Sequence, residues 1–435
     1  MRSRLALALV PLALVAAACG GGGGGGGDGS QVGDKLPTQD TTIKVWSFLP
    51  LNYDGGKATY KHVMDGFRKK HPNITVDLKN IPYDAYWDQL RNSSVAGTGP
   101  DVVTVYGGTT AAGYVGAFEP LQDALSKKQR SNLKFLDSSV GPDGNLYALP
   151  TGEYGYTLTV NKTLLNKAGL DPGTALSSWD GLLSTCKTLK SAGITPFAAG
   201  WSDGYQLETL MYMMMSQLLD PQGLKDWRAA KIGFDDKRFA TALGYIQDMK
   251  QAGCFGEDSL GKSMYNDSFT QIASGKAAIF TSGSSDSALK GNKQLGQGTM
   301  TIMPFPQLPQ SQYSRVIDAG PEAGWAVTSW SGHKAAAWAL VSYLAEADTQ
   351  RYVYKKTGTP PNLSDVSVTS DDPVVSEYLK LLSLPDNHTT YMAFTQPALA
   401  SLERDASGFI AGRKSAEDVL KSADEAQDKA LANLK

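Results

Sequence analysis

The stretch TTIKVWSF, residues 41–48, is a run of β-branched and aromatic residues that predicts the first strand of the fold. Apolar residues at 60–67 then recur with helical spacing, and residues 74–78 alternate as a second strand. Residues 102–106 form a third apolar run, short enough to be a buried strand. Short strands that alternate with amphipathic helices are typical of α/β folds, so we expect parallel sheets covered by helices.

The same alternation continues towards the C-terminus. Ser178 caps a predicted helix at 179–190, a methionine-rich helix face includes Met211 and Met214, and a capping box at Ser415 begins the last helix. Further strands are predicted at 156–160, 195–199, 275–280, 299–305 and 323–329, and further helices at 86–95 and 334–345. A chain of 435 residues exceeds what one core usually holds, which favours two α/β lobes joined by more than one crossing.

The composition is that of a globular protein and excludes several functions. Hydrophobic residues make up 41% of the chain and charged residues 19%, so wholesale disorder is excluded. The formal net charge of −2 gives no electrostatic basis for binding nucleic acid. None of the four histidines lies within four residues of another, and no HExxH motif occurs. We therefore expect neither a metal site nor a cofactor.

The N-terminus has the features of an export signal. A basic start precedes an apolar run at 5–18, which ends in small residues before Cys19. The run is too short for a membrane-spanning helix, and no other stretch reaches the required length. The residues around Cys19 resemble a bacterial lipobox, although Ala16 stands where leucine is usual. The alternative is an ordinary signal peptide, residues 1–18, cleaved after Ala18.

A glycine-rich segment follows Cys19. Residues 20–27 are all glycine, and the polar residues after them offer little apolar surface to bury. We expect residues 19–40 to be an unpacked tether that holds a globular body just off the membrane. With Cys19 lipidated, the protein is expected at the outer face of the cytoplasmic membrane as a lipoprotein, attached by its lipid anchor only.

Cys186 and Cys254 are the remaining cysteines. Export places them in a compartment where disulfides persist, so a disulfide between them is one interpretation. The other interpretation is two buried thiols, because Cys186 lies on an apolar helix stripe with Leu182 and Leu189.

One motif points to an enzyme. Residues 200–204, Gly-Trp-Ser-Asp-Gly, match the G-x-S-x-G pattern and lie between a predicted strand and a predicted helix, with Ser202 as the nucleophile. No HGGG-type oxyanion loop precedes it, so a lipid-anchored hydrolase is the less favoured interpretation. Glu153 and Glu322 are the carboxylates that a glycosidase would use. The simpler interpretation is that both accept hydrogen bonds from hydroxyl groups without any chemistry.

Aromatic residues gather in predicted loops beside glycines and polar residues. Ring faces stack on the C–H faces of sugars while carboxylates and amides bind hydroxyls, so this pattern favours a carbohydrate site. We expect Trp201 to form one wall of a cleft, and the alternative for it is packing in the core. The aromatic residues of the pattern are Phe48, Tyr83, Tyr86, Trp87, Tyr106, Tyr114, Tyr154, Tyr156, Trp201, Tyr205, Trp325 and Tyr391.

Short motifs over residues 41–435 resemble, in their order, those of the extracellular solute-binding proteins, family 1. That family comprises the carbohydrate receptors of ABC importers, with maltose-binding protein among them. The motifs are IKVW (43–46), FRKKHPNI (67–74), GTGPDV (97–102), LYALP (146–150), NKTLL (161–165), GLD (169–171), SWDG (178–181), GITP (193–196), SGKAA (274–278), MPFP (303–306) and TGTPP (357–361).

The resemblance implies a two-lobed periplasmic-binding-protein-like fold of type II, with α/β lobes joined by a three-segment hinge. Residues 41–152 plus 303–356 would form the N-terminal lobe, and residues 153–302 plus 357–435 the C-terminal lobe. It further implies a receptor without catalytic residues or cofactor, which binds a sugar or oligosaccharide and delivers it to an ABC permease. We expect a monomer. The alternative within this class is a receptor for another polar solute, such as a polyol or glycerol phosphate.

By position, the resemblance assigns sugar-binding roles to several segments of this chain. The implied residues are Glu153, Tyr154, Trp201, Asp203, Ser282, Gly283, Ser284, Glu322 and Trp325, with Phe48, Tyr106 and Tyr391 on a looser alignment. Two departures from the family pattern leave the identity of the sugar open. Residues 320–323 read Gly-Pro-Glu-Ala in place of the usual glycine pair, and Thr359 stands where an aromatic residue is common.

Overall fold

The opening run forms strand β1 (Thr41–Ser47), in which alternate side chains are buried. It pairs in parallel with β2 (Ile74–Asn80) and β3 (Val102–Val105). Two antiparallel strands, β10 (Gly324–Val327) and β4 (Leu149–Pro150), complete a sheet of order β2-β1-β3-β10-β4. The computed structural model describes residues 29–432 except 54 and 115, so the export signal, Cys19 and the glycine run lie outside the described residues.

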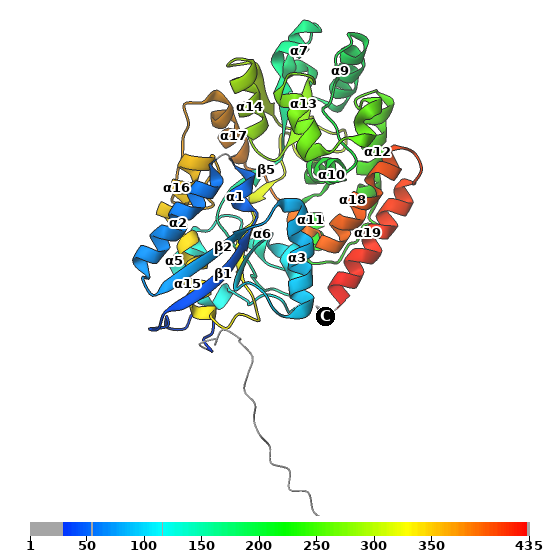
Figure 1. The fold of residues 1–435 in the computed structure, drawn as a ribbon. Helices are drawn as coiled ribbons and strands as arrows, with labels where there is room; N and C mark the ends of the chain where they lie inside the picture. Colours follow the sequence, from blue (N-terminus) through cyan, green and yellow to red (C-terminus); the bar gives the residue numbers. More distant parts are fainter. Residues whose placement is uncertain (1–28, 54, 115, 433–435) are drawn as a thin grey trace, which may run out of the picture.

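Helices surround this sheet and complete the first lobe (Figure 1). On α2, Tyr60, Val63 and Phe67 are buried as the helical spacing predicts, and three basic residues of the last turn face the negative end of the helix dipole. The helices of this lobe are α1 (Leu49–Asn52), α2 (Gly56–Lys70), α3 (Tyr83–Ala96), α4 (Gly108–Ala112), η1 (Gln122–Ala124), α5 (Lys127–Asn132), α6 (Leu136–Ser139), α15 (Lys334–Leu344) and α16 (Ala347–Thr357).

The second lobe contains a smaller sheet of order β7-β6-β8, formed by β6 (Thr157–Asn161), β7 (Ile279–Ser282) and β8 (Met300–Met303). Helix α10 (Tyr205–Leu218) is buried along almost its whole length and carries the methionines predicted to fill the core. The other helices are α7 (Lys162–Lys167), α8 (Pro172–Ala175), α9 (Trp179–Ser191), α11 (Pro221–Arg228), α12 (Lys237–Gln251), η2 (Glu257–Gly261), η3 (Met264–Ser268), α13 (Phe269–Ala273), α14 (Asp286–Leu295), α17 (Pro373–Leu382), η4 (Tyr391–Ala393), α18 (Gln396–Ile410) and α19 (Ala416–Leu431).

Two expectations about the sheets are wrong. Among the strands that the structure describes, only β1 pairs in parallel, with its two neighbours, and every pair in the second sheet is antiparallel. Residues 195–199 do not form a strand, although Ala198 N–H donates to the Ile279 carbonyl and Ile279 N–H to the Pro196 carbonyl. Pro196 has no N–H to continue such a ladder, which limits the segment to isolated bridges.

The lobes are joined by three crossings, and a two-stranded ribbon of β5 (Glu153–Gly155) and β9 (Ala319–Pro321) lies between the sheets. The sequence-based lobe boundaries need correction at two places. Phe305 and Leu308 pack in the second core, so the chain returns to the first lobe only after β9 and not at residue 303. Leu363 and Val366 still pack in the first core, so the third crossing follows them and not residue 356.

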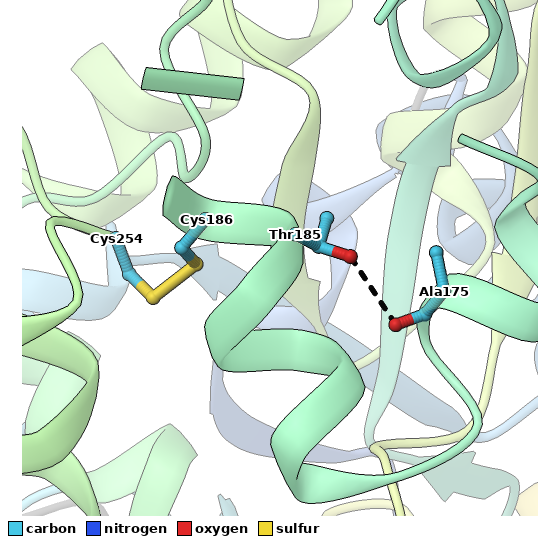
Figure 2. Close-up of a disulfide and its surroundings, with 4 residues drawn as sticks. All are labelled: Ala175, Thr185, Cys186 and Cys254. Carbon is cyan, nitrogen blue, oxygen red and sulfur yellow. Dashed lines mark hydrogen bonds between the residues drawn. A yellow bond between two sulfur atoms is a disulfide. The ribbon is translucent and has the colours of Figure 1, made fainter. Parts of the chain in front are cut away.

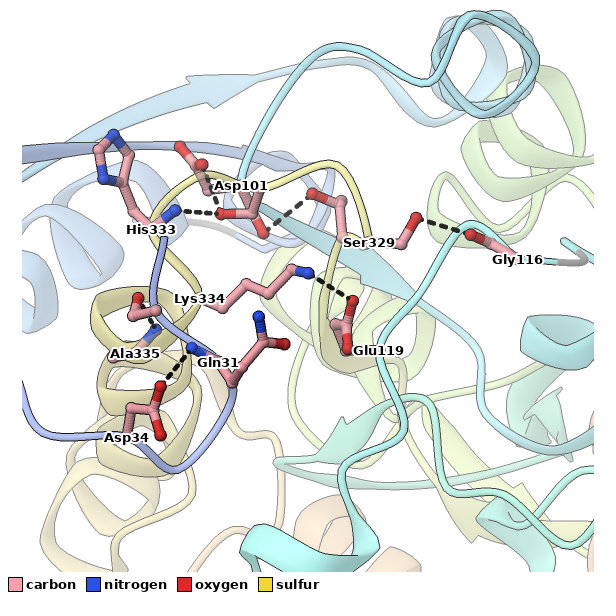
Figure 3. A network of polar contacts seen from close by, with 12 residues as sticks. Gln31, Asp34, Asp101, Gly116, Glu119, Ser329, His333, Lys334 and Ala335 are labelled. Atoms are coloured by element: carbon pink, nitrogen blue, oxygen red, sulfur yellow. Dashed lines mark hydrogen bonds and ion pairs between the residues drawn. The ribbon is translucent and has the colours of Figure 1, made fainter. Parts of the chain in front are cut away.

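The segment after the glycine run packs against the first lobe, which corrects the expectation of an unpacked tether up to residue 40. Ala335 N–H donates to Ser30 Oγ over 3.0 Å at the start of α15, where helical N–H groups lack partners within the helix. Asn73 Nδ2 donates to the Pro37 carbonyl over 2.7 Å. Figure 3 shows Gln31 and Asp34 beside this helix, close to the ion pair of Lys334 with Glu119.

A disulfide joins Cys186 of α9 to Cys254, which follows α12 (Figure 2). Both side chains are fully buried in the second core. Thr185, beside Cys186, donates its hydroxyl to the Ala175 carbonyl over 3.2 Å and ties α9 to α8. Cys186 lies on α9, which Figure 1 shows at the end of the second lobe far from the first lobe.

Candidate ligand-binding cleft

Tyrosines from both lobes and from the ribbon converge between the two lobes. In the first lobe, Tyr106 directly follows β3, at the carboxyl edge of a sheet, where ligands of α/β proteins commonly bind. The set, which we call the cleft tyrosines, comprises Tyr83, Tyr106, Tyr154, Tyr156, Tyr205, Tyr212, Tyr265 and Tyr391.

Ring contacts within this set cross from one lobe to the other. The ring centroid of Tyr106 lies 6.0 Å from that of Tyr391, with the rings edge to face. Tyr83 lies 5.8 Å from Tyr205 and 6.0 Å from Tyr265. Such geometry is favourable for aromatic pairs, so the lobes meet across a continuous surface of rings.

Two further aromatic residues support the cleft tyrosines from behind. Phe48 is buried with its ring 5.1 Å from Tyr83, and Trp87 stacks on Tyr106 at 5.8 Å. Phe48 was expected to contact ligand, whereas its burial places it in the layer under Tyr83 and Tyr106.

Carboxyl groups accompany the rings on the second-lobe side. Glu208 of α10 is buried and interacts with Glu403 of α18. The Tyr212 hydroxyl lies 3.5 Å from Glu208 Oε2. Burial and the neighbouring Glu403 raise the pKa of Glu208 well above its ordinary range. A buried carboxyl pair of this kind holds a proton, which supplies both a donor and acceptors for ligand hydroxyls. Among the described residues, no group of three or more His, Cys, Asp or Glu side chains is placed to hold a metal ion.

Two more carboxyl groups lie at the crossings. Glu153 of β5 forms an ion pair with Lys134 of the first lobe, and burial still raises the pKa of Glu153. Glu322, just after β9, accepts a hydrogen bond from the Tyr53 hydroxyl. Burial and the charge of Asp286 raise the pKa of Glu322 to about 7. Each group therefore links the hinge to the first lobe through a polar contact.

A small cavity opens beside these carboxyl groups. It is lined by residues of both lobes and of the ribbon, among them Tyr53, Glu153, Tyr154, Ser284, Asp286 and Thr359. Of the predicted segment 282–284, Ser284 lines the cavity, and Ser282 supports it because Ser282 Oγ donates to the Ser284 carbonyl over 2.8 Å. A Cβ at Gly283 would overlap the Tyr154 hydroxyl, at 1.7 Å, so this position requires glycine.

Two of the expected wall residues belong to the cores. Trp201 has 0% exposed surface and packs edge to face on Phe255 within the second core. Trp325 of β10 is equally buried, and its indole N–H donates to Thr151 Oγ1. The expectation that Trp201 walls the cleft is therefore wrong, because its loop folds inwards against residues 259–264.

Asp203 has a structural role. Its Oδ2 accepts the backbone N–H of Met264 over 2.8 Å, and its Oδ1 is buried without a hydrogen-bond partner. The residue therefore holds the next loop, which carries Tyr265. Tyr391 is buried, and its hydroxyl donates to the Pro321 carbonyl, so its ring and not its hydroxyl is available to the cleft.

The G-x-S-x-G motif lacks the geometry of a nucleophile elbow. No strand precedes Gly200, and the backbone N–H of Ser202 donates to the Lys262 carbonyl. His388 Nδ1 lies 2.8 Å from the Asp386 carbonyl in another part of the lobe.

Several residues of the site were missed from the sequence. Tyr83, Tyr156 and Tyr205 carried the aromatic loop signal but were not assigned roles. Tyr265 stands in the polar run Ser-Met-Tyr-Asn-Asp, an aromatic residue among polar residues, which is the pattern that could have identified it. Tyr212 lies on the methionine-rich helix face, where nothing in the local sequence distinguishes a site residue from a core residue.

A family model described as bacterial extracellular solute-binding protein matches residues 52–351. An uncharacterized ABC transporter extracellular-binding protein of Pyrococcus horikoshii is 23% identical over 82% of this chain and 80% of its own. The galactooligosaccharide-binding protein of Bacillus subtilis is 24% identical, with 72% of each chain covered.

Among solved structures, a chitin oligosaccharide binding protein superposes with a TM-score of 0.78. The match covers 90% of this chain and 99% of that protein at 19% identity, which shows a common fold.

Proposed function

The chain belongs to the bacterial extracellular solute-binding proteins, the substrate-binding components of ABC importers, and from this premise we propose that its ligand is a carbohydrate held in the cleft between the lobes. The observation that carries the proposal is the set of cleft tyrosines, contributed by both lobes and by the ribbon. A ligand that touches all three parts favours the closed arrangement through its differential affinity for it.

The chemistry of the cleft suits sugars. Aromatic faces pack against the C–H faces of pyranose rings, while Glu208, Glu153 and Glu322 offer carboxyl groups to hydroxyls. An affinity of about 1 μM corresponds to about −8 kcal/mol. A few ring contacts of about 1 kcal/mol each, with several hydrogen bonds to charged groups at about 2 kcal/mol, supply this after ordering costs.

The other interpretations from the sequence are less well supported. A phosphate-bearing ligand calls for a converging arginine, whereas the cleft tyrosines are accompanied by carboxyl groups. Hydrolysis at Ser202 lacks the strand-turn-helix geometry. We propose that the protein binds and delivers its ligand without catalysis, as members of a binding-protein family do.

We further propose that Cys19 carries a lipid anchor. Within the part of the chain that the structure describes, no helix has the length and apolar character needed to cross a membrane. Packing of the segment from Ser30 on the first lobe leaves about ten residues between Cys19 and the body, which reach roughly 35 Å at full extension. Cys19→Ser should release the exported protein from the membrane fraction; continued membrane association would contradict the anchor.

A ligand screen tests the carbohydrate proposal. Thermal unfolding is followed with mono- and oligosaccharides of maltose, xylose, galactose and N-acetylglucosamine type, with amino acids and inorganic phosphate as the comparison. We expect a selective rise in Tm with one sugar class, which is lost in Tyr106→Ala and kept in Tyr352→Ala. Tyr352 of α16 stacks on His62 of α2, both in the first lobe and neither among the cleft residues, and is the matched control. A response only to amino acids or phosphate would contradict the proposal.

A further inference from the structure

Glu208 lies among the cleft tyrosines of both lobes. It shares one face of α10 with Tyr205 and Tyr212, because the three positions are three and four residues apart. Only 6% of its surface is exposed, and its Oε2 lies 3.5 Å from the Tyr212 hydroxyl. Burial raises the pKa of Tyr83 and Tyr106 of the first lobe, and the charge of Glu208 adds to both shifts. Rings from both lobes therefore surround one buried carboxyl group.

The fold brings a second carboxyl group to Glu208 through a close approach of two helices. Gly204, the N-cap of α10, has a positive φ of 78°, and a Cβ there would lie 2.2 Å from the Cα of Glu403 on α18. Glycine thus lets α18 contact the start of α10. Burial, and after it the charge of Glu403, raises the pKa of Glu208 well above its ordinary range. Two buried like charges destabilise a fold, so packing alone does not account for the pair.

This carboxyl pair, Glu208 and Glu403, has no positively charged partner within the chain. Neither residue forms an ion pair with any residue that the structure describes, whereas Glu153 at the crossing is paired with Lys134. Burial raises the pKa of Glu403 to about 7, and the charge of Arg91 on α3 opposes this shift only in part. The Arg91 guanidinium is half exposed and forms an ion pair on its own helix over 3.0 Å. The carboxyl pair therefore brings negative charge to the cleft that no side-chain cation neutralises.

The tyrosine rings add a second attraction for a cation. The π face of an aromatic ring attracts an ammonium group within about 6 Å of the ring centroid, most strongly where water is excluded. The rings beside Glu208 pack against further rings, with Tyr212 at 5.1 Å from Tyr156 and Tyr205 at 4.8 Å from Tyr265. Burial raises the pKa of all four hydroxyls, so they stay protonated and bring no charge of their own. Aromatic rings around an unneutralised carboxyl pair are suited to a protonated amine.

We propose that the ligand is an amino sugar, whose protonated amine lies among the cleft tyrosines and donates hydrogen bonds to Glu208 and Glu403. The inference rests on the proposed carbohydrate function and narrows it to a positively charged class of sugar. A hydroxyl or an N-acetylamino group at the same carbon offers hydrogen bonds but no positive charge. The carboxyl pair therefore distinguishes the amine from both, because a hydrogen bond between charged groups is the stronger one.

Calorimetric titrations with matched sugars test this inference at about pH 7, where an amine of ordinary pKa is charged. Each set contains one sugar in three forms, with a hydroxyl, an N-acetylamino or a free amino group at the same carbon. The sets are those of glucose, galactose and mannose, as monosaccharides and as 1,4-linked disaccharides. In the set that binds, the amino form should bind about tenfold or more tightly than the other two forms.

A double variant, Glu208→Gln with Glu403→Gln, locates the effect. Because the carboxyl pair shares a proton, either single variant leaves one carboxylate that still ionises, whereas the double variant keeps the shape and removes the charge. Its preference for the amino form should fall to within about twofold, with affinity for the hydroxyl form within about twofold of wild type. Glu346→Gln removes a carboxylate that pairs with Lys70 outside the cleft, and this control should keep the full preference.

The outcomes separate the two proposals. If no form of any sugar binds, the carbohydrate function fails, and the amino-sugar inference with it. If a hydroxyl or N-acetylamino form binds as tightly as the amino form, the carbohydrate function stands and the amino-sugar inference is contradicted. A preference for the amino form that the folded double variant keeps, as judged by an unchanged Tm, contradicts the role of Glu208 and Glu403.

Discussion

Trp201 is a residue for which the sequence predicts a position in the cleft and the structure shows a position in the core. Its indole is buried in the second core, and its N–H has no hydrogen-bond partner. We predict that Trp201→Ala costs about 3 to 5 kcal/mol of unfolding free energy, the cost of removing a large core side chain, with ligand affinity of the folded protein nearly unchanged. Denaturant unfolding and titration on one preparation measure both. Weakened binding with an unchanged unfolding midpoint would contradict this prediction.

The glycines around Trp201 explain why the sequence predicts an exposed loop there. Glycines beside an aromatic residue are typical of exposed loops, but at Gly204 a Cβ would lie 2.2 Å from the backbone of Glu403. Gly200 is in the same situation against Ser263. Here glycine serves close packing of chain segments that are far apart in the sequence. Local sequence cannot separate the two uses, since the partner segment is known only from the fold.

Asp318 provides a pH-dependent prediction. It is fully buried and accepts the Thr390 N–H, yet burial raises its pKa from 3.8 to about 7. The folded state therefore holds this proton more tightly than the unfolded chain. The stability from this group is fully present below about pH 4 and is lost as the pH rises through about 7.

We expect Asp318→Asn to narrow the difference in unfolding midpoint between about pH 5 and pH 8. Denaturant titrations at several pH values measure this, with the exposed Asp371→Asn as the control. An Asp318→Asn profile that parallels wild type would show that the group does not govern the pH dependence.

At the scale of elements, the sequence was reliable where the signal is local. The amphipathic face of α2 and the Ser178 cap of α9 are as predicted, and so is the capping box of α19, in which Ser415 and Asp418 bond each other's N–H groups. Strand direction was not predictable, because alternating short strands and helices suit parallel and antiparallel sheets alike. The missing strand at 195–199 depends on a proline and on its neighbour β7, a contact distant in sequence.

The disulfide between α9 and the end of α12 gives a prediction at the same scale. It closes a loop of 68 residues in the unfolded chain, so Cys186→Ala with Cys254→Ala should cost about 2 to 4 kcal/mol of stability. The bridge starts from α9, at the end of the second lobe far from the first lobe, so ligand binding should be unchanged. Denaturant unfolding of wild type with reductant should match the double variant. Equal stability of oxidised and reduced wild type would contradict the prediction.

At the scale of the whole molecule, the two-lobed fold was predictable from the ordered motifs, and most of the site was not. The cleft tyrosines come from α3, from the end of β3, from the ribbon and from three segments of the second lobe. Which of the many aromatic residues meet depends on how the lobes face each other. Residues named from the crossing loop, such as Glu153 and Tyr154, do line the cavity, because β5 itself is the crossing.

The boundaries between the lobes were likewise not predictable from the local sequence. The segment between β8 and β9 stays with the second lobe through Phe305 and Leu308, although the sequence motif at 303–306 marked it as the return. A crossing is defined by the core that the flanking residues join. That information appears only when both cores are assembled.

The central claim is that the lobes close around the ligand. The contacts between the lobes define the closed arrangement. Thr110 of the first lobe donates its hydroxyl to the Phe394 carbonyl of the second over 2.7 Å, and the cleft tyrosines touch across the gap. A sugar cannot enter through such contacts, so the lobes must separate to admit it and close again on binding.

Small-angle scattering with and without the sugar that raises Tm tests this claim most directly. We predict a ligand-free radius of gyration larger than that of the described fold, and a decrease at saturation to the value of the closed arrangement. The same comparison in Tyr106→Ala should show a decrease only at higher sugar concentration, because that variant loses an inter-lobe contact and a ring for the ligand. An identical radius of gyration with and without saturating sugar would contradict closure.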